Sequence, residues 1–244
     1  MARYLLTIEY DGTAYEGWQY QEGKPTIEGA IEDAIEHIIH ERVTIYGSGR
    51  TDSGVHALRQ KAHFDSEREL DVQRLARAIN YYLPLDIAIV RAERVADDFH
   101  ARYNVRCKTY LYKIYNGAER SPLRCGRYME THYTLDIGAM RSALDMLKGV
   151  HDFKGFATAG SSVKTTVREI YRADILTQGE EIYIYVGGSG FLYNMVRTIV
   201  GTLIDVGRGK RTLDEMKTLI DTGDIRLKGA VAPASGLYLY DVEY

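Results

Sequence analysis

Two stretches of the chain resemble each other, and both alternate apolar with polar side chains as half-buried strands do. Residues 110–117 repeat the pattern of residues 4–12 with one residue deleted. Each stretch is followed by apolar residues at helical spacing, over Thr26–Ile39 in the first case and Leu135–Leu147 in the second. A strand-then-helix unit that occurs twice predicts two related halves.

Further elements complete the second half. Strand patterns cover Glu169–Thr177 and Glu181–Gly187, and an apolar helix is predicted over Phe191–Val206. The order resembles β-α-β-β-α-β halves, each a sheet with helices on one face. Because the chain has four prolines and no Gly/Ser-rich spacer, we expect the halves to be joined through their sheets and not by a flexible tether. The predicted fold class is α+β.

The composition indicates a soluble globular protein. The 244 residues are 45% hydrophobic and 27% charged, and no apolar stretch has membrane length. The first residues lead directly into a strand pattern, so no signal peptide is expected. Cys107 and Cys125 have no CxxC spacing and no histidine pair at ligand distance. We therefore expect reduced thiols, a cytoplasmic location and no metal site.

The net charge of −3 is unusual for a protein that binds nucleic acid, because such proteins are commonly basic. The net charge does not show where the charged residues lie, however. From charge alone, a cluster of positive residues can be either a solvated surface or a phosphate-binding surface. The positive residues that gather together are Arg102, Arg106, Lys108, Lys113, Arg120, Arg124, Arg127, Arg208, Lys210 and Arg211.

The run Gly47–Ala57, GSGRTDSGVHA, is too rich in glycine for a helix or a regular strand. Its glycines permit positive φ and close backbone approach, so Asp52 can be presented on a tight turn. Arg50 lies two residues away, and a neighbouring cation lowers the pKa of a carboxylate, which favours an ionised Asp52 that acts as nucleophile or electrostatic stabiliser. In the alternative, Asp52 only caps backbone N–H groups and Arg50 is solvated. A phosphate loop is disfavoured, because the Walker lysine is missing and Asp52 replaces the third glycine of a dinucleotide fingerprint.

Tyr110 and Arg197 are further candidates for the site. Tyr110 lies in a tyrosine-rich strand, where an aromatic can equally pack in the core or across strands. Arg197 lies in an otherwise apolar helix, so it should face a carboxylate such as Asp52 or a phosphate, or else extend to the helix surface. His56 and His100 lack metal-ligand spacing, and we expect them to be hydrogen-bonding loop residues or RNA contacts.

The stretch GSGRTDSGVHA resembles the signature of the TruA family of tRNA pseudouridine synthases, in which the aspartate of G-R-T-D is the catalytic nucleophile. The resemblance continues along the chain, with Ser53, Glu22, Lys228 and Val231 as departures from the family pattern. The other matching segments are Tyr10-Asp11-Gly12-Thr13, Gly17-Trp18-Gln19, Phe99-His100-Ala101-Arg102, Lys108-Thr109-Tyr110-Leu111-Tyr112, His151-Asp152-Phe153, Phe191-Leu192-Tyr193-Asn194-Met195-Val196-Arg197, Ile199-Val200-Gly201 and Ala232-Pro233-Ala234-Ser235-Gly236-Leu237-Tyr238-Leu239.

The resemblance implies a fold and a site. The fold would be two ferredoxin-like (RRM-like) halves, residues 1–104 and 105–244, which share a continuous, mainly antiparallel sheet with helices on one face and a central RNA-binding cleft. Asp52 would be the nucleophile. Substrate binding would fall to Tyr110, Arg50, Arg197 and Leu237.

The implied activity is isomerisation of uridine to pseudouridine in the anticodon stem-loop of tRNA, by resemblance at tRNA positions 38–40. The enzyme would be a homodimer without cofactor or metal. Two alternative functions remain open. One is a non-catalytic RNA-binding protein whose tyrosines stack on bases, and the other is a small-molecule hydrolase or transferase that uses Asp52 and Arg50. Neither explains why the GRTD, KTY and MVR motifs occur together.

Overall fold

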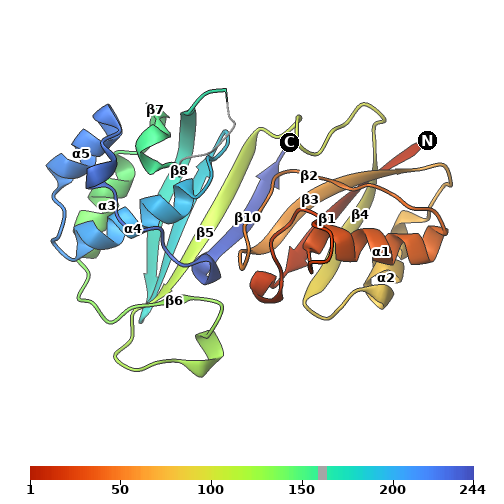
Figure 1. The fold of residues 1–244 in the computed structure, drawn as a ribbon, viewed down its shortest axis with the longest axis horizontal. Helices are drawn as coiled ribbons and strands as arrows, with labels where there is room; N and C mark the ends of the chain where they lie inside the picture. The colour runs from red at the N-terminus through yellow and green to blue at the C-terminus, as the bar shows by residue number, and fades with distance from the viewer. Residues whose placement is uncertain (159–163) are drawn as a thin grey trace. The chain divides into compact units, whose positions relative to one another are not determined.

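The computed structural model describes residues 1–158 and 164–244. Contacts divide these residues into two compact units (Figure 1). Unit 1 comprises Met1–Arg106 and Tyr238–Tyr244, and unit 2 comprises Cys107–Leu237. No helix in the described part of the chain is long and apolar enough to cross a membrane.

Unit 1 is a mainly antiparallel sheet with two helices. β1 is its central strand and pairs antiparallel with β3 and β4. β2 pairs antiparallel with β3 near His63, and β10 runs parallel to β3 near His56. The elements are β1 (Ala2–Tyr10), η1 (Gly12–Ala14), α1 (Ile27–Ile39), β2 (Tyr46–Gly47), β3 (His56–Ser66), α2 (Val72–Tyr82), β4 (Ile87–Val95) and, from the end of the chain, β10 (Leu237–Glu243).

The helices of unit 1 begin at side chains that accept a backbone N–H, as N-caps do. The Thr26 hydroxyl accepts from the Gly29 N–H at 3.3 Å, and the Asp71 carboxylate accepts from the Gln73 N–H at 2.9 Å. Helices α1 and α2 contact each other, and α2 packs on β4. The helical periodicity predicted over Thr26–Ile39 is confirmed, with Thr26 as its cap.

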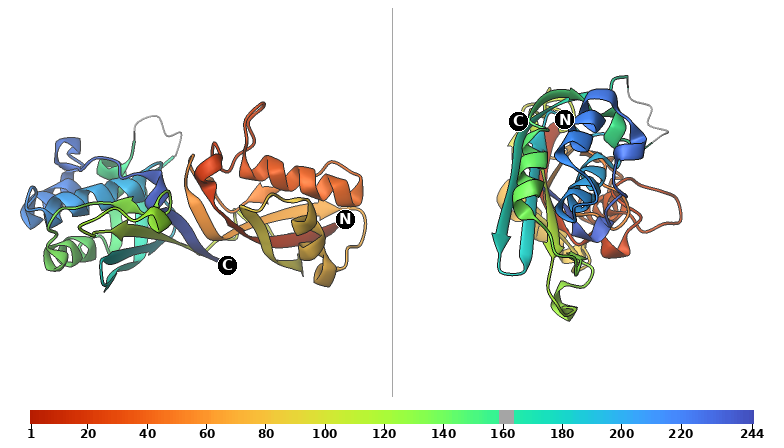
Figure 2. Two further views of the ribbon diagram at one scale, coloured as in Figure 1. Left: turned by 90° about the horizontal axis from the view of Figure 1, so that it is seen from below. Right: turned by 90° about the vertical axis from the view of Figure 1, so that its left-hand side faces the viewer.

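Unit 2 is an antiparallel sheet in the order β5-β9-β8-β7, and the short β6 runs parallel to β5. α4 and α5 lie on one side of β8 and β9 (Figure 2), and α3 packs on α4 and β8. The elements are β5 (Cys107–Tyr115), η2 (Pro122–Arg124), β6 (Met129–Glu130), α3 (Ile137–Asp145), β7 (Gly149–Asp152), η3 (Phe153–Phe156), β8 (Val167–Gln178), β9 (Glu181–Gly188), α4 (Met195–Gly207), α5 (Leu213–Thr222), η4 (Ile225–Leu227) and η5 (Ala234–Gly236).

The predicted start of the helix over Phe191–Val206 is wrong by four residues. α4 begins at Met195, because Asn194 has a left-handed backbone with φ of 60° and ends the preceding turn. The Asn194 amide donates to the Thr158 hydroxyl at 3.0 Å. The α+β class and the mainly antiparallel sheets are confirmed.

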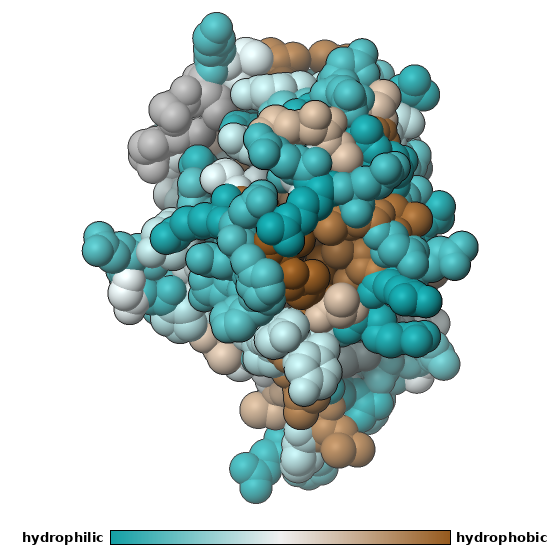
Figure 3. Space-filling model, turned by 90° about the vertical axis from the view of Figure 1, so that its right-hand side faces the viewer, coloured by the Kyte–Doolittle hydropathy of each residue, from teal (hydrophilic) through white to brown (hydrophobic). Residues whose placement is uncertain are grey.

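The surface seen in Figure 3 is covered mostly by polar side chains, and apolar residues gather in one area at its centre. The core of unit 1 contains Leu6, Ile8 and Ile35, and that of unit 2 contains Ile184 and Leu203, all fully buried. Each unit therefore has an apolar interior of its own, which gives its loops a rigid support.

Candidate active site

The loop that carries Asp52 covers residues 48–55, between β2 and β3. Gly47 belongs to β2, and His56 and Ala57 belong to β3, so the irregular part is shorter than the predicted run Gly47–Ala57. The reason is that both ends of the run can pair with neighbouring strands although their composition is typical of a loop.

Buried polar groups hold the first half of this loop. The Ser48 N–H donates to the Lys61 carbonyl at 2.7 Å, and the Ser48 hydroxyl donates to Gln60 Oε1 at 2.6 Å. Gln60 Nε2 in turn donates to the Gly49 carbonyl at 2.8 Å. Ser48 and Gln60 are both fully buried. Buried polar side chains that are paired in this way fix a backbone strongly, because breaking one bond leaves another group unsatisfied.

The second half of the loop is a tight turn that begins at Asp52. The Val55 N–H donates to the Asp52 carbonyl at 3.1 Å, and Gly54 has φ of +75°, which a glycine adopts without strain. Gly54 N and the Ser53 hydroxyl both donate to the Tyr15 carbonyl, at 3.3 and 3.2 Å. The Asp52 side chain is thus presented, half exposed, from the first position of a turn that is held at two points.

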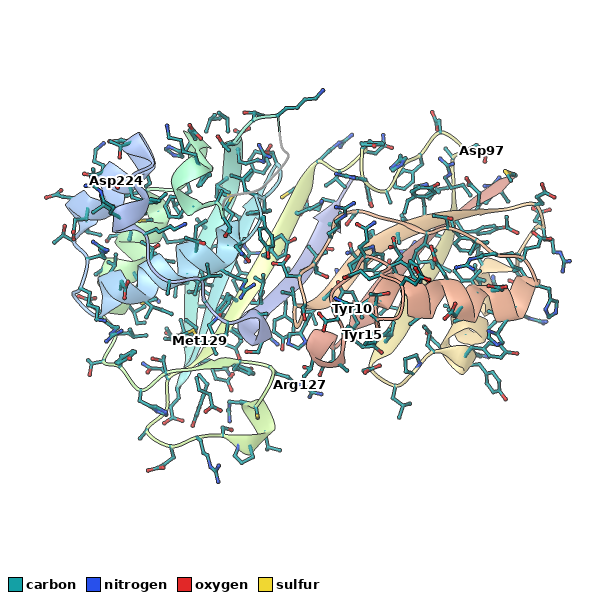
Figure 4. All side chains as sticks on the ribbon, in the orientation of Figure 1. Tyr10, Tyr15, Asp97, Arg127, Met129 and Asp224 are labelled. Carbon is teal, nitrogen blue, oxygen red and sulfur yellow. The ribbon has the colours of Figure 1, made fainter. Side chains whose placement is uncertain are left out.

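The segment before α1 supports the middle of the loop. Tyr10 and Tyr15, which flank η1, are labelled in Figure 4. The Tyr10 hydroxyl lies 2.8 Å from Thr51 Oγ1, and the Trp18 N–H donates to the Thr51 carbonyl at 3.0 Å. Gly17 has φ of +98°, and a Cβ on it would lie 2.6 Å from the Thr51 carbonyl oxygen. The loop therefore packs against two segments that are distant from it in sequence, Tyr10–Thr13 and Gly17–Gln19.

Two glycines of the run Gly47–Ala57 serve the two purposes expected of them, one each. Among glycines 47, 49 and 54, Gly54 alone has a positive φ. Gly47 is required for close approach, because a Cβ there would lie 2.7 Å from the Trp18 indole. The prediction of positive φ is therefore right at Gly54, while the prediction of close backbone approach is right at Gly47.

Arg50 and His56 flank the turn. Arg50 is exposed, and its charge acts on Glu28 of α1. The pKa of Glu28 is raised by burial, and the Tyr20 N–H and Arg50 offset only part of this rise. His56 is buried, accepts the Gly12 N–H at Nδ1 and stacks on Tyr238 at 4.6 Å. His56 therefore joins η1 and β10 to the start of β3.

In unit 2, Tyr110 lies on β5 opposite Val186 of β9, and its ring meets Phe191 edge-on at 5.0 Å. Tyr112, two residues on and on the same face of the strand, is fully buried and donates to the Pro233 carbonyl at 2.8 Å. Tyr110 is only half buried. The tyrosine-rich strand thus contains a core tyrosine at 112 and an accessible one at 110.

Arg197 lies in the first turn of α4 and is half buried. Its Nε donates to the Ala232 carbonyl at 2.7 Å, and Nη1 donates to Asn194 Oδ1 at 3.0 Å. The same side-chain amide of Asn194 that donates to Thr158 thereby orients the guanidinium. Sequence reasoning missed Asn194 in this role, because its side chain makes no cap hydrogen bond and the apolar pattern starts before it, at Phe191.

The segment from Ala232 to Leu237 connects the two candidate elements of unit 2. Ala232 exchanges hydrogen bonds with Arg197 of α4, and Pro233 accepts from Tyr112 of β5. A Cβ on Gly236 would lie 2.6 Å from the Tyr112 ring. Leu237, the last residue of unit 2, is buried.

The candidate residues are therefore distributed over both units. Unit 1 brings Asp52 and Arg50 together on one loop, and unit 2 holds Tyr110, Arg197 and Leu237. Over residues 1–158 and 164–244, no group of three or more His, Cys, Asp or Glu side chains is arranged to hold a metal ion.

Comparison with known proteins gives consistent results. Residues 6–104 and 143–244 match the sequence model of a family described as tRNA pseudouridine synthase. The tRNA pseudouridine synthase A of Caldicellulosiruptor bescii is 46% identical over 244 residues, which is the full length of both chains. A Clostridium perfringens protein named tRNA pseudouridine synthase A 2 is also 46% identical over the full length of both.

A weaker likeness links the chain to a crystal structure of an archaeal box H/ACA sRNP complex. The sequence identity is 12% and the TM-score is 0.37, with 82% of this chain and 43% of that chain covered.

Proposed function

The chain belongs to the tRNA pseudouridine synthase family, and we propose that it converts uridine to pseudouridine in the anticodon stem-loop of tRNA, with Asp52 as the nucleophile. Its activity is that of an isomerase that modifies tRNA. The observation that supports Asp52 most strongly is its position at the start of a turn that is bonded to the Tyr15 carbonyl and preceded by Thr51, which Tyr10 and Trp18 hold. A carboxylate fixed in this way is ready to attack without reorganising its loop.

The bonds broken and formed in the reaction balance without a cofactor, because the product is an isomer of the substrate. The glycosidic C–N bond breaks, a C–C bond forms between the same sugar and the same uracil, and one proton moves from ring carbon to ring nitrogen. Uridine must first leave the base stack, at a cost of a few kcal/mol. Asp52 then bonds covalently to the nucleotide, the uracil is rotated and rejoined through carbon, and the free carboxylate is regenerated.

We assign the remaining candidates to substrate binding. Arg50, exposed beside Asp52, would attract a phosphate of the RNA backbone. Tyr110, half buried against Phe191, would stack on the target base and move a proton through its hydroxyl. Arg197, oriented by Ala232 and Asn194, would pair with a carboxylate or phosphate, and Leu237 would form an apolar wall for the base.

In this proposal residues 1–104 supply the catalytic aspartate, and residues 105–244 supply the residues that bind the base. We further propose that the protein works in the cytoplasm, which agrees with Cys107 and Cys125 forming no disulfide in the described part of the chain. It would act as a homodimer, because its basic clusters are too dispersed for one chain to bind a whole tRNA. A mass in solution equal to one chain would contradict the dimer.

The direct test is incubation with an unmodified tRNA transcript, followed by mapping of pseudouridine along the product. We expect pseudouridine in the anticodon stem-loop and nowhere else in the transcript. Binding of the tRNA without turnover would favour the RNA-binding rival, and indifference to the tRNA would favour the small-molecule enzyme.

A further inference from the structure

Four aromatic rings form a continuous group in unit 1, on the side of β3 that carries β2. We call Tyr46, His63, His100 and Tyr103 the aromatic stack. Tyr46 and His63 stack with ring centroids 5.1 Å apart, at an angle of 22°. His100 meets the edge of His63 at 4.7 Å, and Tyr103 lies 4.2 Å from His100. None of these residues has a role in the site described above.

The aromatic stack is buried at one end and open at the other. His63 is fully buried, whereas Tyr46 is 47% exposed and Tyr103 is 76% exposed. These two exposed rings each contact His100, at 5.7 Å and 4.2 Å between centroids, and contribute little to the core. Rings of this kind are typical of a contact surface, because they provide apolar area with a polar tip.

Hydrogen bonds fix the loop that carries His100 and Tyr103. His63 Nδ1 accepts the Ala101 N–H at 3.2 Å, and His100 Nδ1 accepts the Arg102 N–H at 3.1 Å. The Tyr244 hydroxyl donates to the Ala101 carbonyl at 2.9 Å. The rings are therefore preorganised, which reduces the entropic cost of binding a partner.

Arg3 and Arg102 lie near the imidazoles of the aromatic stack, and Arg3 is paired with Asp65 at 2.7 Å. The pKa of His63 is lowered to about 4, first by burial and then by Arg3 and His100. The pKa of His100 is also lowered, by burial and then by Arg3 and Arg102. Both imidazoles are thus neutral near pH 7. Arg102 is exposed and forms no ion pair within the described residues, so it adds an available positive charge beside neutral rings.

We propose that the aromatic stack, with Arg102 beside it, binds an unpaired nucleobase and an adjacent phosphate of the RNA substrate. Exposed aromatic rings next to a cation are the usual means of binding single-stranded RNA. Tyr46 precedes Asp52 by six residues, a chain length that spans at most about 22 Å. One RNA molecule can therefore contact the aromatic stack and Asp52 at the same time. The inference rests on the proposed function in taking tRNA as the substrate.

The test measures Kd for an unmodified tRNA transcript at fixed salt. Tyr46→Ala and Tyr103→Ala should each weaken binding about 5- to 150-fold, the range expected for one base–aromatic stack, while Tyr46→Phe should retain affinity. Tyr81→Ala is the matched control, because Tyr81 is 82% exposed in the same unit and lies on α2, so its loss should leave Kd unchanged. Arg102→Gln should reduce the slope of log Kd against log salt by about 0.7–0.9.

Thermal unfolding checks that each variant is folded. If Tyr46→Ala does not fold, the tRNA affinity of Tyr103→Ala alone decides the test. If both alanine variants bind tRNA as the wild type does, the inference is wrong, even where the wild type forms pseudouridine and the proposed function stands. Equal losses for Tyr46→Phe and Tyr46→Ala would also contradict stacking. If the alanine variants lose tRNA affinity but the wild type forms no pseudouridine, the proposed function fails and the RNA-binding surface remains.

Discussion

Gly17→Ala is expected to impair catalysis by moving the backbone that carries Asp52. The new Cβ would lie 2.6 Å from the Thr51 carbonyl oxygen and 3.2 Å from the Asp52 carbonyl carbon. Because Cβ contacts shorter than 3.0 Å essentially do not occur, the Thr51–Asp52 peptide and the backbone at residue 17 must separate by at least the difference of 0.4 Å. The backbone at φ of +98° adds strain of about 1–3 kcal/mol.

A displacement of 1 Å at a reacting group can reduce a rate about 100-fold, so we expect kcat/KM for pseudouridine formation to fall by about 10- to 100-fold. The assay compares kcat/KM and thermal stability of Gly17→Ala with those of Gly23→Ala. Gly23 also has a positive φ, of +72°, but a Cβ there meets nothing within 4 Å. Gly23→Ala should therefore lose some stability and keep its activity. Equal activities of the two variants would refute the reasoning that Gly17 positions Asp52.

Three further predictions follow from single side chains. Tyr110→Phe keeps the ring and removes the hydroxyl, so if that hydroxyl moves a proton, the rate should fall by about 10²- to 10⁴-fold with little change in Kd for tRNA. Gln60→Leu removes the partner of the buried Ser48 hydroxyl and the Gly49 carbonyl, which should lower the free energy of unfolding in urea by about 1–3 kcal/mol. The pKa of His63 is lowered in the folded state to about 4 from an ordinary value of 6.5, so the unfolded chain binds more protons between these values. Stability should therefore fall as the pH drops from about 6.5 to about 4, and His63→Phe should flatten this part of the unfolding curve against pH.

Local patterns were sufficient to predict elements whose periodicity and cap agree. The helix predicted over Thr26–Ile39 is α1, because apolar spacing and the Thr26 cap coincide. The helix predicted from Phe191 begins instead at Met195. Phe191 and Leu192 continue the apolar pattern, and periodicity does not register the left-handed backbone at Asn194.

The sequence was sufficient to predict the residues of the candidate site, but not the hydrogen bonds that hold the Asp52 loop in place. Glycine content marked the Asp52 loop, and Gly54 does take the positive φ that a turn requires. The hydrogen bonds from Gln60 to Gly49 and between Tyr10 and Thr51 join residues distant in sequence. The first bond depends on the register of β2 on β3 and the second on that of β1 on β3, and no local pattern specifies either register. For the same reason no pattern in Leu237–Glu243 indicates that β10 lies beside β3.

Asp52→Asn tests the central claim most directly, because it keeps the size and the hydrogen-bonding reach of the side chain and removes the nucleophilic anion. Asp33→Asn, the same change on the exposed face of α1, is the matched control. We expect Asp52→Asn to bind unmodified tRNA with the affinity of the wild type and to form no detectable pseudouridine in a single turnover, while Asp33→Asn stays fully active. Pseudouridine formation by Asp52→Asn at a rate comparable to that of Asp33→Asn would place the chemistry on another residue and contradict the account.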